Sequence, residues 1–322
     1  MLAESLIALV GFISLRAMPV GAAEMPAVNA LPVARYAAPN VQPPLKRGTE
    51  SLGVETTARS AAILDVKSGA FLVEKDANSA YPIASLTKLM TAMVLLDSKT
   101  NLQEEVTMDP ADLPKEEGKS VFLPTERLTK RDLLRALLVG SVNSAGNAIA
   151  RSWPEGEEAF IKAMNQKART LGLRSAVYYD PTGLDARNQA SARDVAIILR
   201  TALAYPEVRD ITKLERVEIK GRSNNRTYVV KNTNLLLDSF LNKPPYRVIA
   251  AKTGSLPEAG YCLAQVTRNA EGNEIVAVVL GSDNHFARFQ DAKVLTYWTF
   301  KNYEWPRSGM NAALAPLEEE RP

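Results

Sequence analysis

Short apolar runs of strand length stand in two regions of the chain, and turn residues bound both regions. Near the start, two runs are separated by a turn that contains Gly69, which is typical of a β-hairpin. Near the end, three runs follow one another, the last two joined through a polar segment with Gly272. The predicted strands are residues 61–66, 70–73, 247–253, 261–268 and 274–281.

Helical spacing replaces strand spacing between these two regions. Residues 85–98 carry apolar side chains three and four positions apart and contain no proline or glycine, so they predict a helix. The same criteria, with Gly172 and Pro206 as stop signals, predict helices over 129–139, 157–171, 191–204 and 286–302. This order indicates an α/β fold: an antiparallel sheet flanked by helices, with a mainly helical lobe inserted at about 99–246.

The two ends of the chain lack these periods. Residues 6–15 are mostly apolar and small residues follow at 21–23, so residues 1–23 predict a signal peptide and a periplasmic protein, although Glu4 rather than Lys or Arg precedes the run. Prolines scattered among Ala, Val and Asn predict a linker over 24–57. The folded domain is then expected over 58–306. A flexible tail at 307–322 has no long apolar face, and no stable membrane anchor is expected.

Composition narrows the function classes. The 322 residues are 46% hydrophobic and 23% charged, which suits one large two-lobed domain. A net charge of +3 from 39 basic and 36 acidic residues argues against nucleic acid as a partner. The single cysteine, Cys262, excludes an internal disulfide and is expected to be a buried strand residue. The single histidine, His285, argues against a His-rich zinc site and is expected on the surface, at the start of the last helix.

Three short motifs occur in a fixed order: Ser85-Leu86-Thr87-Lys88, Ser141-Val142-Asn143 and Lys252-Thr253-Gly254. At average Ser and Lys frequencies, a chain of this length contains roughly one Ser-x-x-Lys by chance. The evidence for a functional site is therefore the occurrence of all three motifs together. On a helix, Ser85 and Lys88 share a face, and the amine can take the hydroxyl proton if its pKa is lowered by burial or by a nearby positive charge. Lys252 could supply that charge. The backbone N–H of Ser85, at the helix start, can help to form an oxyanion hole.

The other two motifs predict the walls of a cleft. Ser141 and Asn143 follow a predicted helix and are expected in a loop with their polar side chains directed into the cleft. Lys252 and Thr253 end an apolar strand whose edge could receive an extended peptide. Gly254, without a side chain, is expected to let a ligand approach the backbone closely.

In this order the three motifs resemble those of penicillin-binding proteins and class A β-lactamases. Similarity to the low-molecular-mass penicillin-binding proteins extends over about 61–305 and includes Pro82-Ile83-Ala84, Leu89-Met90-Thr91-Ala92, Asp180-Pro181-Thr182-Gly183-Leu184, Asn232-Thr233-Asn234-Leu235 and Ala259-Gly260-Tyr261-Cys262-Leu263. The resemblance implies the penicillin-binding protein/β-lactamase-like fold. It also implies a serine D,D-peptidase that cleaves D-alanyl-D-alanine peptides of peptidoglycan, is inhibited covalently by β-lactam antibiotics, and needs neither a cofactor nor a metal.

The resemblance assigns roles to the catalytic motif residues. Ser85 would be the nucleophile and Lys88 its general base. Ser141 would relay a proton to the leaving amine. Asn143 would bind the peptide carbonyl of the substrate and orient Lys88.

The resemblance also assigns the substrate-binding strand. Lys252 and Thr253 would bind the terminal or equivalent carboxylate, beside Gly254, and the backbone N–H of Ser255 would be the second oxyanion donor. Ser144 stands where many carboxypeptidases of the family carry Asp. The short chain, with no β-rich domain after the Lys-Thr-Gly domain, most resembles the D-alanyl-D-alanine endopeptidases, and a carboxypeptidase is the alternative.

Two further Ser-x-Asn strings, Ser282-Asp283-Asn284 and Ser223-Asn224-Asn225, stand in the wrong order for catalysis and are expected to be turn residues. A class A β-lactamase and an inert binding protein remain alternatives to the peptidase. The β-lactamase would need a deacylating acid in a Glu-x-x-Leu-Asn string, which the sequence does not contain. All catalytic residue types are present, which argues against an inert protein.

Overall fold

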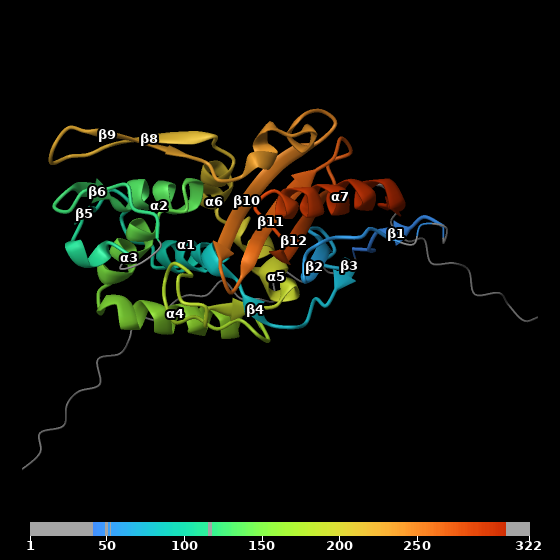
Figure 1. Cartoon of the computed structure of the whole chain (residues 1–322), viewed down its shortest axis with the longest axis horizontal. Helices are drawn as coiled ribbons and strands as arrows, with labels where there is room; N and C mark the ends of the chain where they lie inside the picture. Colours follow the sequence, from blue (N-terminus) through green and yellow to red (C-terminus); the bar gives the residue numbers. More distant parts are fainter. Residues whose placement is uncertain (1–40, 49–50, 52, 115–117, 307–322) are drawn as a thin grey trace, which may run out of the picture.

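A five-stranded antiparallel sheet forms the centre of the computed structural model, which describes residues 41–48, 51, 53–114 and 118–306 (Figure 1). The five predicted strands are confirmed, with ends that differ by up to three residues. Their spatial order is β10-β11-β12-β2-β3, so the early hairpin pairs with the last of the late strands. The bounds are β2 (Ser60–Asp65), β3 (Phe71–Lys75), β10 (Arg247–Leu256), β11 (Gly260–Arg268) and β12 (Glu274–Ser282).

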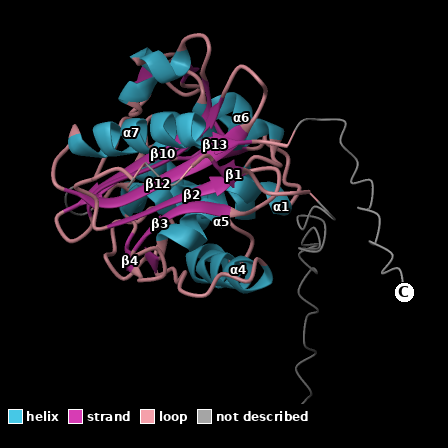
Figure 2. Ribbon diagram, turned by 90° about the vertical axis from the view of Figure 1, so that its right-hand side faces the viewer, coloured by secondary structure: helices cyan, strands magenta, loops and turns pink. Residues whose placement is uncertain are grey.

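Helices cover both faces of this sheet (Figure 2). Helix α7 (Ala287–Asn302) packs on one face, and α5 (Ala192–Ala202) packs on the other. Along β2, Ala61 and Ile63 belong to the apolar cluster under α7, whereas Ala62 and Leu64 belong to the cluster under α5. Since side chains alternate between the faces of a strand, a sheet covered on both sides needs continuous apolar runs, and this is the pattern in the sequence.

The predicted helix 85–98 begins as a 3-10 turn, η2 (Ala84–Thr87), and continues as α1 (Lys88–Asp97). Helix α1 is buried from Lys88 to Leu95 and contacts α5 on the sheet side and three helices of the lobe. An apolar helix that is buried all round lies inside a protein rather than on its surface. The start of α1 therefore lies between the sheet and the lobe.

The inserted lobe contains more than the sequence predicts. Its elements are α2 (Lys130–Val139), α3 (Asn143–Arg151), α4 (Gly156–Thr170), α6 (Pro206–Thr212) and two hairpins, β5 (Glu105–Thr107) with β6 (Arg127–Thr129) and β8 (Arg216–Lys220) with β9 (Thr227–Lys231). Helices α3 and α6 and both hairpins are missed by the periodicity. Pro206 opens α6 at its first position instead of only ending a helix. The helix predicted over 191–204 is α5, and it packs on the sheet rather than in the lobe.

The segment expected as a linker contributes to the fold at its C-terminal part. Strand β1 (Leu45–Lys46) pairs with β13 (Tyr303–Glu304), which follows α7. The remaining short elements are β4 (Tyr81–Pro82), which pairs with β7 (Gln189–Ala190), and the 3-10 turns η3 (Pro110–Asp112), η4 (Leu235–Asp238) and η5 (Phe240–Asn242). The expected signal peptide and tail lie outside the described residues. Within the described ranges, no helix is long and apolar enough to cross a membrane.

A buried carboxylate joins the start of the sheet to the last helix. Asp291 on α7 accepts hydrogen bonds from the backbone N–H and the hydroxyl of Thr57, at 3.0 and 2.8 Å, and from the N–H of Ala58 at 3.0 Å. The hydroxyl of Ser282 at the end of β12 donates to it as well, at 2.7 Å. One side chain on α7 thus satisfies donors from two further segments, the entry to β2 and the end of β12.

Replacing Asp291 with Ala is expected to lower the free energy of unfolding by about 2–4 kcal/mol, because the donors of buried Ala58 and Ser282, and those of Thr57, lose their acceptor. Urea unfolding followed by circular dichroism measures this loss. The exposed Asp283 offers a matched control, and Asp283→Ala should change stability by less than about 0.5 kcal/mol. Equal stability of the two variants would contradict the structural role of Asp291.

Candidate active site

The turn that carries Ser85 has an unusual backbone. Ala84 is buried and has a φ of 46°, in the left-handed region that non-glycine residues rarely adopt. Two glycines pack against it: a Cβ on Gly183 would lie 1.8 Å from the carbonyl oxygen of Ala84, and a Cβ on Gly254 would lie 2.9 Å from that of Ile83. Such a strained conformation costs about 1–3 kcal/mol and persists only where its surroundings enforce it.

This packing gives Gly254 a role in the fold besides the expected one. The sequence predicts that Gly254 admits a ligand to the backbone. In the structure, the protein itself occupies the direction in which a Cβ would point, because a Cβ there would also lie 3.1 Å from the backbone nitrogen of Ser85. Gly254 therefore lets strand β10 approach the turn that carries Ser85.

Ser85 and Lys88 are in direct contact, as their spacing predicts. The Nζ of Lys88 lies 2.7 Å from the Oγ of Ser85 and 2.7 Å from the carbonyl oxygen of Thr182. Lys88 is fully buried, and this burial lowers its pKa from 10.5 to about 7, although the charge of Asp180 opposes the shift. A large fraction of the amine is then neutral near pH 7 and can accept the proton of Ser85. The charge interaction between Lys88 and Lys252 that the sequence suggests is seen at Lys252, whose pKa the charge of Lys88 lowers.

The loop that holds Lys88 from the far side is built around Asp180. Its carboxylate accepts hydrogen bonds from the N–H groups of Thr182, Gly183 and Asp185, and from the hydroxyl of Thr182. The side chain of Asn188 ties the same loop to Thr87 in η2. The sequence marks this Asp-Pro-Thr-Gly string only through a resemblance. The carbonyl of Thr182 in this string accepts from Lys88, which lies 94 residues earlier, and no local pattern in the sequence predicts that contact.

A second serine–lysine pair lies beside the first. The Nζ of Lys252 is 2.8 Å from the Oγ of Ser141 and 2.9 Å from the carbonyl oxygen of Thr253. Burial lowers the pKa of Lys252 well below its ordinary value, and the positive charges of Lys88, Arg288 and Lys119 lower it further. The expectation that Ser141 and Lys252 share one site therefore agrees with the geometry.

Asn143 departs in part from its expected surroundings. It is the first residue of α3 rather than a loop residue, and it exchanges two hydrogen bonds with the backbone of Lys119, at 2.7 and 3.1 Å. The expected contact with Lys88 is absent, since the described partners of Lys88 are Ser85 and Thr182. The side-chain Nδ2 of Asn143 is buried and has no partner among the described residues. This donor suits an acceptor such as a peptide carbonyl.

The end of β10 carries the remaining predicted residues. The hydroxyl of Thr253 is 2.6 Å from that of Thr233, and Ser255 is exposed at the open side. Arg288 from α7, which the sequence missed, donates from Nη1 to the carbonyl of Gly254 at 2.9 Å. Arg288 is only 4% exposed, and burial lowers its pKa to about 10. Among the described residues, no carboxylate forms an ion pair with Lys252 or Arg288, so the site favours an anionic ligand group.

The rejected motifs lie at turns, except that Ser282 is the last residue of strand β12. The Oδ1 of Asn284 accepts from the N–H groups of Phe286 and Ala287 at the start of α7, and Asn225, with a φ of 59°, lies in the turn between β8 and β9. Cys262 is buried in β11, and burial raises its pKa to about 11, so its expected role as a strand residue is confirmed. In the part of the chain that the structure describes, no three His, Cys, Asp or Glu side chains form a group that could hold a metal.

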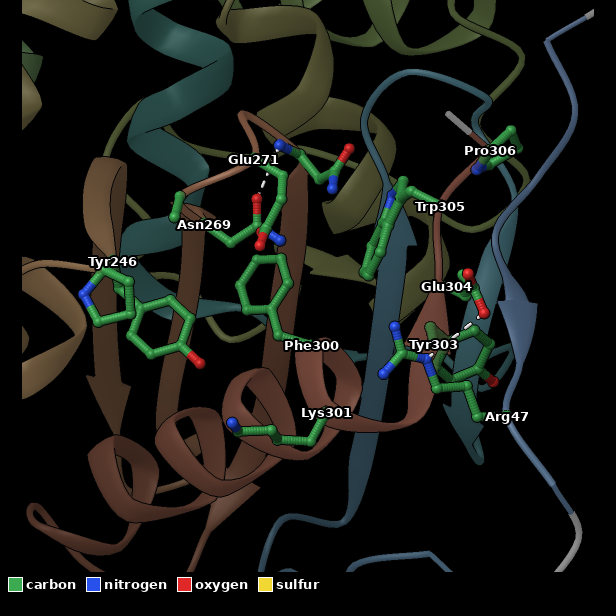
Figure 3. Close-up of a pocket in the computed structure, with 13 residues that line it drawn as sticks. Arg47, Tyr246, Asn269, Glu271, Phe300, Lys301, Tyr303, Glu304, Trp305 and Pro306 are labelled. Carbon is green, nitrogen blue, oxygen red and sulfur yellow. Dashed lines mark hydrogen bonds and ion pairs between the residues drawn. The ribbon is translucent and has the colours of Figure 1, made fainter. Parts of the chain in front are cut away.

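A pocket of about 500 Å³ lies away from this site, at the opposite ends of β10 and β11 (Figure 3). Tyr246, Phe300 and Trp305 line it together with polar residues of the turn between β11 and β12. None of the motif residues belongs to it. The candidate active site is therefore the junction of η2, α3 and β10, and not this pocket.

The chain matches known proteins over most of its length. A protein-family model described as D-alanyl-D-alanine carboxypeptidase matches residues 46–284. A D-alanyl-D-alanine endopeptidase of Pseudomonas aeruginosa is 34% identical over 262 residues, which is 80% of this chain and 82% of the relative. A D-alanyl-D-alanine endopeptidase of Escherichia coli is 34% identical over 249 residues, which is 76% of this chain and 77% of the relative.

Solved structures agree. The crystal structure of a Streptomyces DD-transpeptidase has a TM-score of 0.72 at 27% identity and covers 78% of this chain and 100% of that chain. A penicillin-binding protein of Listeria monocytogenes in its cefotaxime-bound form has a TM-score of 0.67 at 26% identity, with coverage of 78% and 100%. The resemblance and the fold predicted from the sequence are confirmed.

Replacing Asp180 with Ala is expected to destabilise the protein by about 2–4 kcal/mol, since three backbone donors of its loop lose their acceptor. The matched control in the same loop is Asp185→Ala, which breaks a surface ion pair with Arg187 and should cost about 1 kcal/mol or less. Urea unfolding of both variants measures the difference. Similar losses for the two variants would mean that Asp180 does not organise the loop that holds Lys88.

Proposed function

Because the chain belongs to the D-alanyl-D-alanine carboxypeptidase family, and is a serine D,D-peptidase and a penicillin target, we propose that Ser85 is its nucleophile and Lys88 its general base. The observation that carries this proposal is the 2.7 Å contact between Ser85 Oγ and the fully buried Nζ of Lys88. A buried amine with a pKa of about 7 is the kind of base that a serine nucleophile needs near neutral pH.

The first half of the reaction forms an acyl-enzyme. The proton of Ser85 passes to Lys88 while the serine oxygen bonds to the carbonyl carbon of the D-alanyl residue. The negative charge on the carbonyl oxygen is stabilised by the backbone N–H groups of Ser85 and Ser255. The carbon–nitrogen bond then breaks, and the leaving amine receives a proton through Ser141. Water then attacks the ester and loses a proton to Lys252 through Ser141, while the proton on Lys88 returns to the released oxygen of Ser85, which completes the hydrolysis.

The second serine–lysine pair couples the two proton transfers. Burial and then the charge of Lys88 lower the pKa of Lys252. A proton that arrives on Lys88 therefore makes Lys252 a better donor, and Ser141, 2.8 Å from Lys252, can pass that proton to the leaving amine. Proton uptake on one side of the site thus favours proton release on the other.

Substrate binding follows from charge and from the sheet edge. Strand β10 is an edge strand, which can pair with an extended peptide (Figure 1). The cations Lys252 and Arg288, with the hydroxyl of Thr253, would bind a carboxylate at the end of this strand. The unpartnered Nδ2 of Asn143 would donate to a peptide carbonyl of the substrate. These groups suit the stem peptides of peptidoglycan, and the proposed place of action is the periplasm.

We further propose that the preferred reaction is cleavage of crosslinks. The two relatives that are 34% identical are both named D-alanyl-D-alanine endopeptidases. Ser144, where many carboxypeptidases of the family carry Asp, is uncharged and bonds through its hydroxyl to Ser120 at 3.1 Å. A carboxypeptidase is the alternative. A β-lactamase is less well supported, because no Glu-x-x-Leu-Asn string provides a deacylating acid.

Penicillin is expected to form a stable covalent adduct with Ser85, because the amine freed from the opened β-lactam stays attached to the acyl group and no deacylating acid is present. Intact mass spectrometry detects the adduct and times its formation. Below about pH 6 the acylation rate should fall about tenfold per pH unit, because protonated Lys88, with its pKa of about 7, cannot take the proton. The acylation rate is at its maximum above this pKa and decreases as the pH falls through it.

Two variants control this experiment. Ser85→Ala should give no adduct, and an equal adduct on that protein would refute the nucleophile assignment. Lys88→Arg keeps a cation but cannot deprotonate near neutral pH, so it should also remain unmodified. Near-normal acylation of Lys88→Arg would exclude Lys88 as the base.

Crosslinked dimeric muropeptides should be cleaved at least as fast as D-alanine is removed from the monomeric pentapeptide. Both reactions use the same acyl-enzyme, so the preference depends on whether the cleft accepts a bulky leaving amine. Parallel turnover assays on the two purified substrates, with products separated by mass, measure it. Turnover of the monomer with an untouched dimer would identify a carboxypeptidase instead.

A further inference from the structure

Arg288 reaches the proposed active site through a backbone carbonyl. Its Nη1 donates to the carbonyl oxygen of Gly254 at 2.9 Å, and its Nη2 lies 3.0 Å from Nδ1 of His285. The guanidinium also lies 5.5 Å from the ring centre of Tyr261 and 4.8 Å from that of Phe289. With these contacts and no carboxylate ion pair among the described residues, the position of Arg288 depends on neutral partners.

The carbonyl that Arg288 holds belongs to a peptide unit with a second function. The C=O of Gly254 and the N–H of Ser255 are in the same planar trans peptide, so they point in opposite directions. Fixing the carbonyl on the side of α7 directs the N–H of Ser255 to the other side. A charged donor on the carbonyl also polarises the peptide and strengthens that N–H as a donor. This peptide adjoins the N–H of Ser85, since Gly254 packs against the backbone nitrogen of Ser85.

His285 can hold Arg288 in only one protonation state. A guanidinium has donors and no acceptor, so Nδ1 of His285 must accept and cannot carry a proton in this arrangement. The imidazole ring is fixed by edge-to-face contacts with Tyr261, Phe286 and Phe289, at 6.1, 5.1 and 5.6 Å between ring centres. The side chain is otherwise exposed, as the sequence predicts, so its protonation follows the pH of the solvent.

We propose that His285 is a positioning residue for acyl transfer: neutral His285 holds Arg288 on the Gly254 carbonyl, and thereby directs the N–H of Ser255 at the substrate. This inference rests on the proposed nucleophilic role of Ser85. A proton on His285 would remove the acceptor and place a second cation 3.0 Å from Arg288. At low pH, Arg288 would then no longer be held on the Gly254 carbonyl, and the N–H of Ser255 would no longer be directed at the substrate.

The surroundings of His285 set the direction of this pH dependence. The titratable groups that face it are Arg288 on α7 and Tyr261 on β11. Burial and then the charge of Arg288 lower the pKa of His285 below 6.5. The link is therefore intact near pH 7 and is lost as pH falls through that lowered pKa.

Two variants of His285 distinguish the effect of its hydrogen-bond acceptor from the effect of its protonation. In His285→Asn, Oδ1 stands about where Nδ1 was and accepts at every pH, whereas His285→Leu has no acceptor. The rate of Ser85 acylation by penicillin is measured from pH 4.5 to 8 by intact mass, together with thermal unfolding. Gln290→Ala, an exposed change on α7, is the control and should match the unmodified protein.

At pH 7.5, His285→Asn should acylate at nearly the normal rate and His285→Leu about tenfold more slowly, a smaller loss than removal of a whole oxyanion donor. Between pH 7.5 and 5 the unmodified protein should lose about tenfold more rate than His285→Asn, which keeps only the dependence on Lys88. A folded His285→Leu with the normal rate, or equal pH profiles for the unmodified protein and His285→Asn, would overturn the inference. If the unmodified protein is not acylated at all, the proposed function fails first, and this inference fails with it.

Discussion

The structure depends on the burial of one amine, that of Lys88, between a hydroxyl and a backbone carbonyl. Removing an ammonium group from water is costly. In this protein the cost is reduced because the pKa of Lys88 falls to about 7, and not because a carboxylate pairs with it. That choice requires a dry, well-packed setting. Helix α1 is buried along most of its length, and the Asp180 loop closes over its first turn. The lowered pKa of Lys88 and the packing of the fold therefore share one requirement, which is the exclusion of water from the start of α1.

The glycines beside this turn show how close packing serves the chemistry. Gly183 and Gly254 come from segments that are far apart in the sequence, and each lacks the Cβ that would collide with the backbone of Ile83 and Ala84. They allow a loop and a strand to clamp a turn whose Ala84 is in the left-handed region. Ser85 is thereby held at a fixed point between Lys88 and strand β10. A looser junction would let the hydroxyl leave the reach of Lys88.

Periodicity predicted the sheet and the long helices because each buries a continuous apolar face that is visible in a local window. It missed α3, where small residues such as Gly146 pack closely but give little hydrophobic signal, and α6, where Pro206 was interpreted only as a stop. The spacing and order of the three motifs predict that Ser85, Lys88, Ser141 and Lys252 share one site, and the structure brings each serine within hydrogen-bond distance of a lysine. The Thr182 carbonyl and Arg288 were beyond reach, since a backbone group has no sequence signature and both contacts join distant segments.

The pairing of β1 with β13 has a consequence for chain connectivity. Leu45 lies opposite Glu304, so the two ends of the folded domain are neighbours in space. Neighbouring termini are the geometric condition for circular permutation. A linker could join the chain across these ends. New termini could then be opened at the exposed turn between β8 and β9, because these two strands pair only with each other and do not belong to the central sheet. Ser85 and Lys252 would then exchange their order along the polypeptide while keeping their places in the fold, which separates the sequence order of the motifs from the chemistry that they perform.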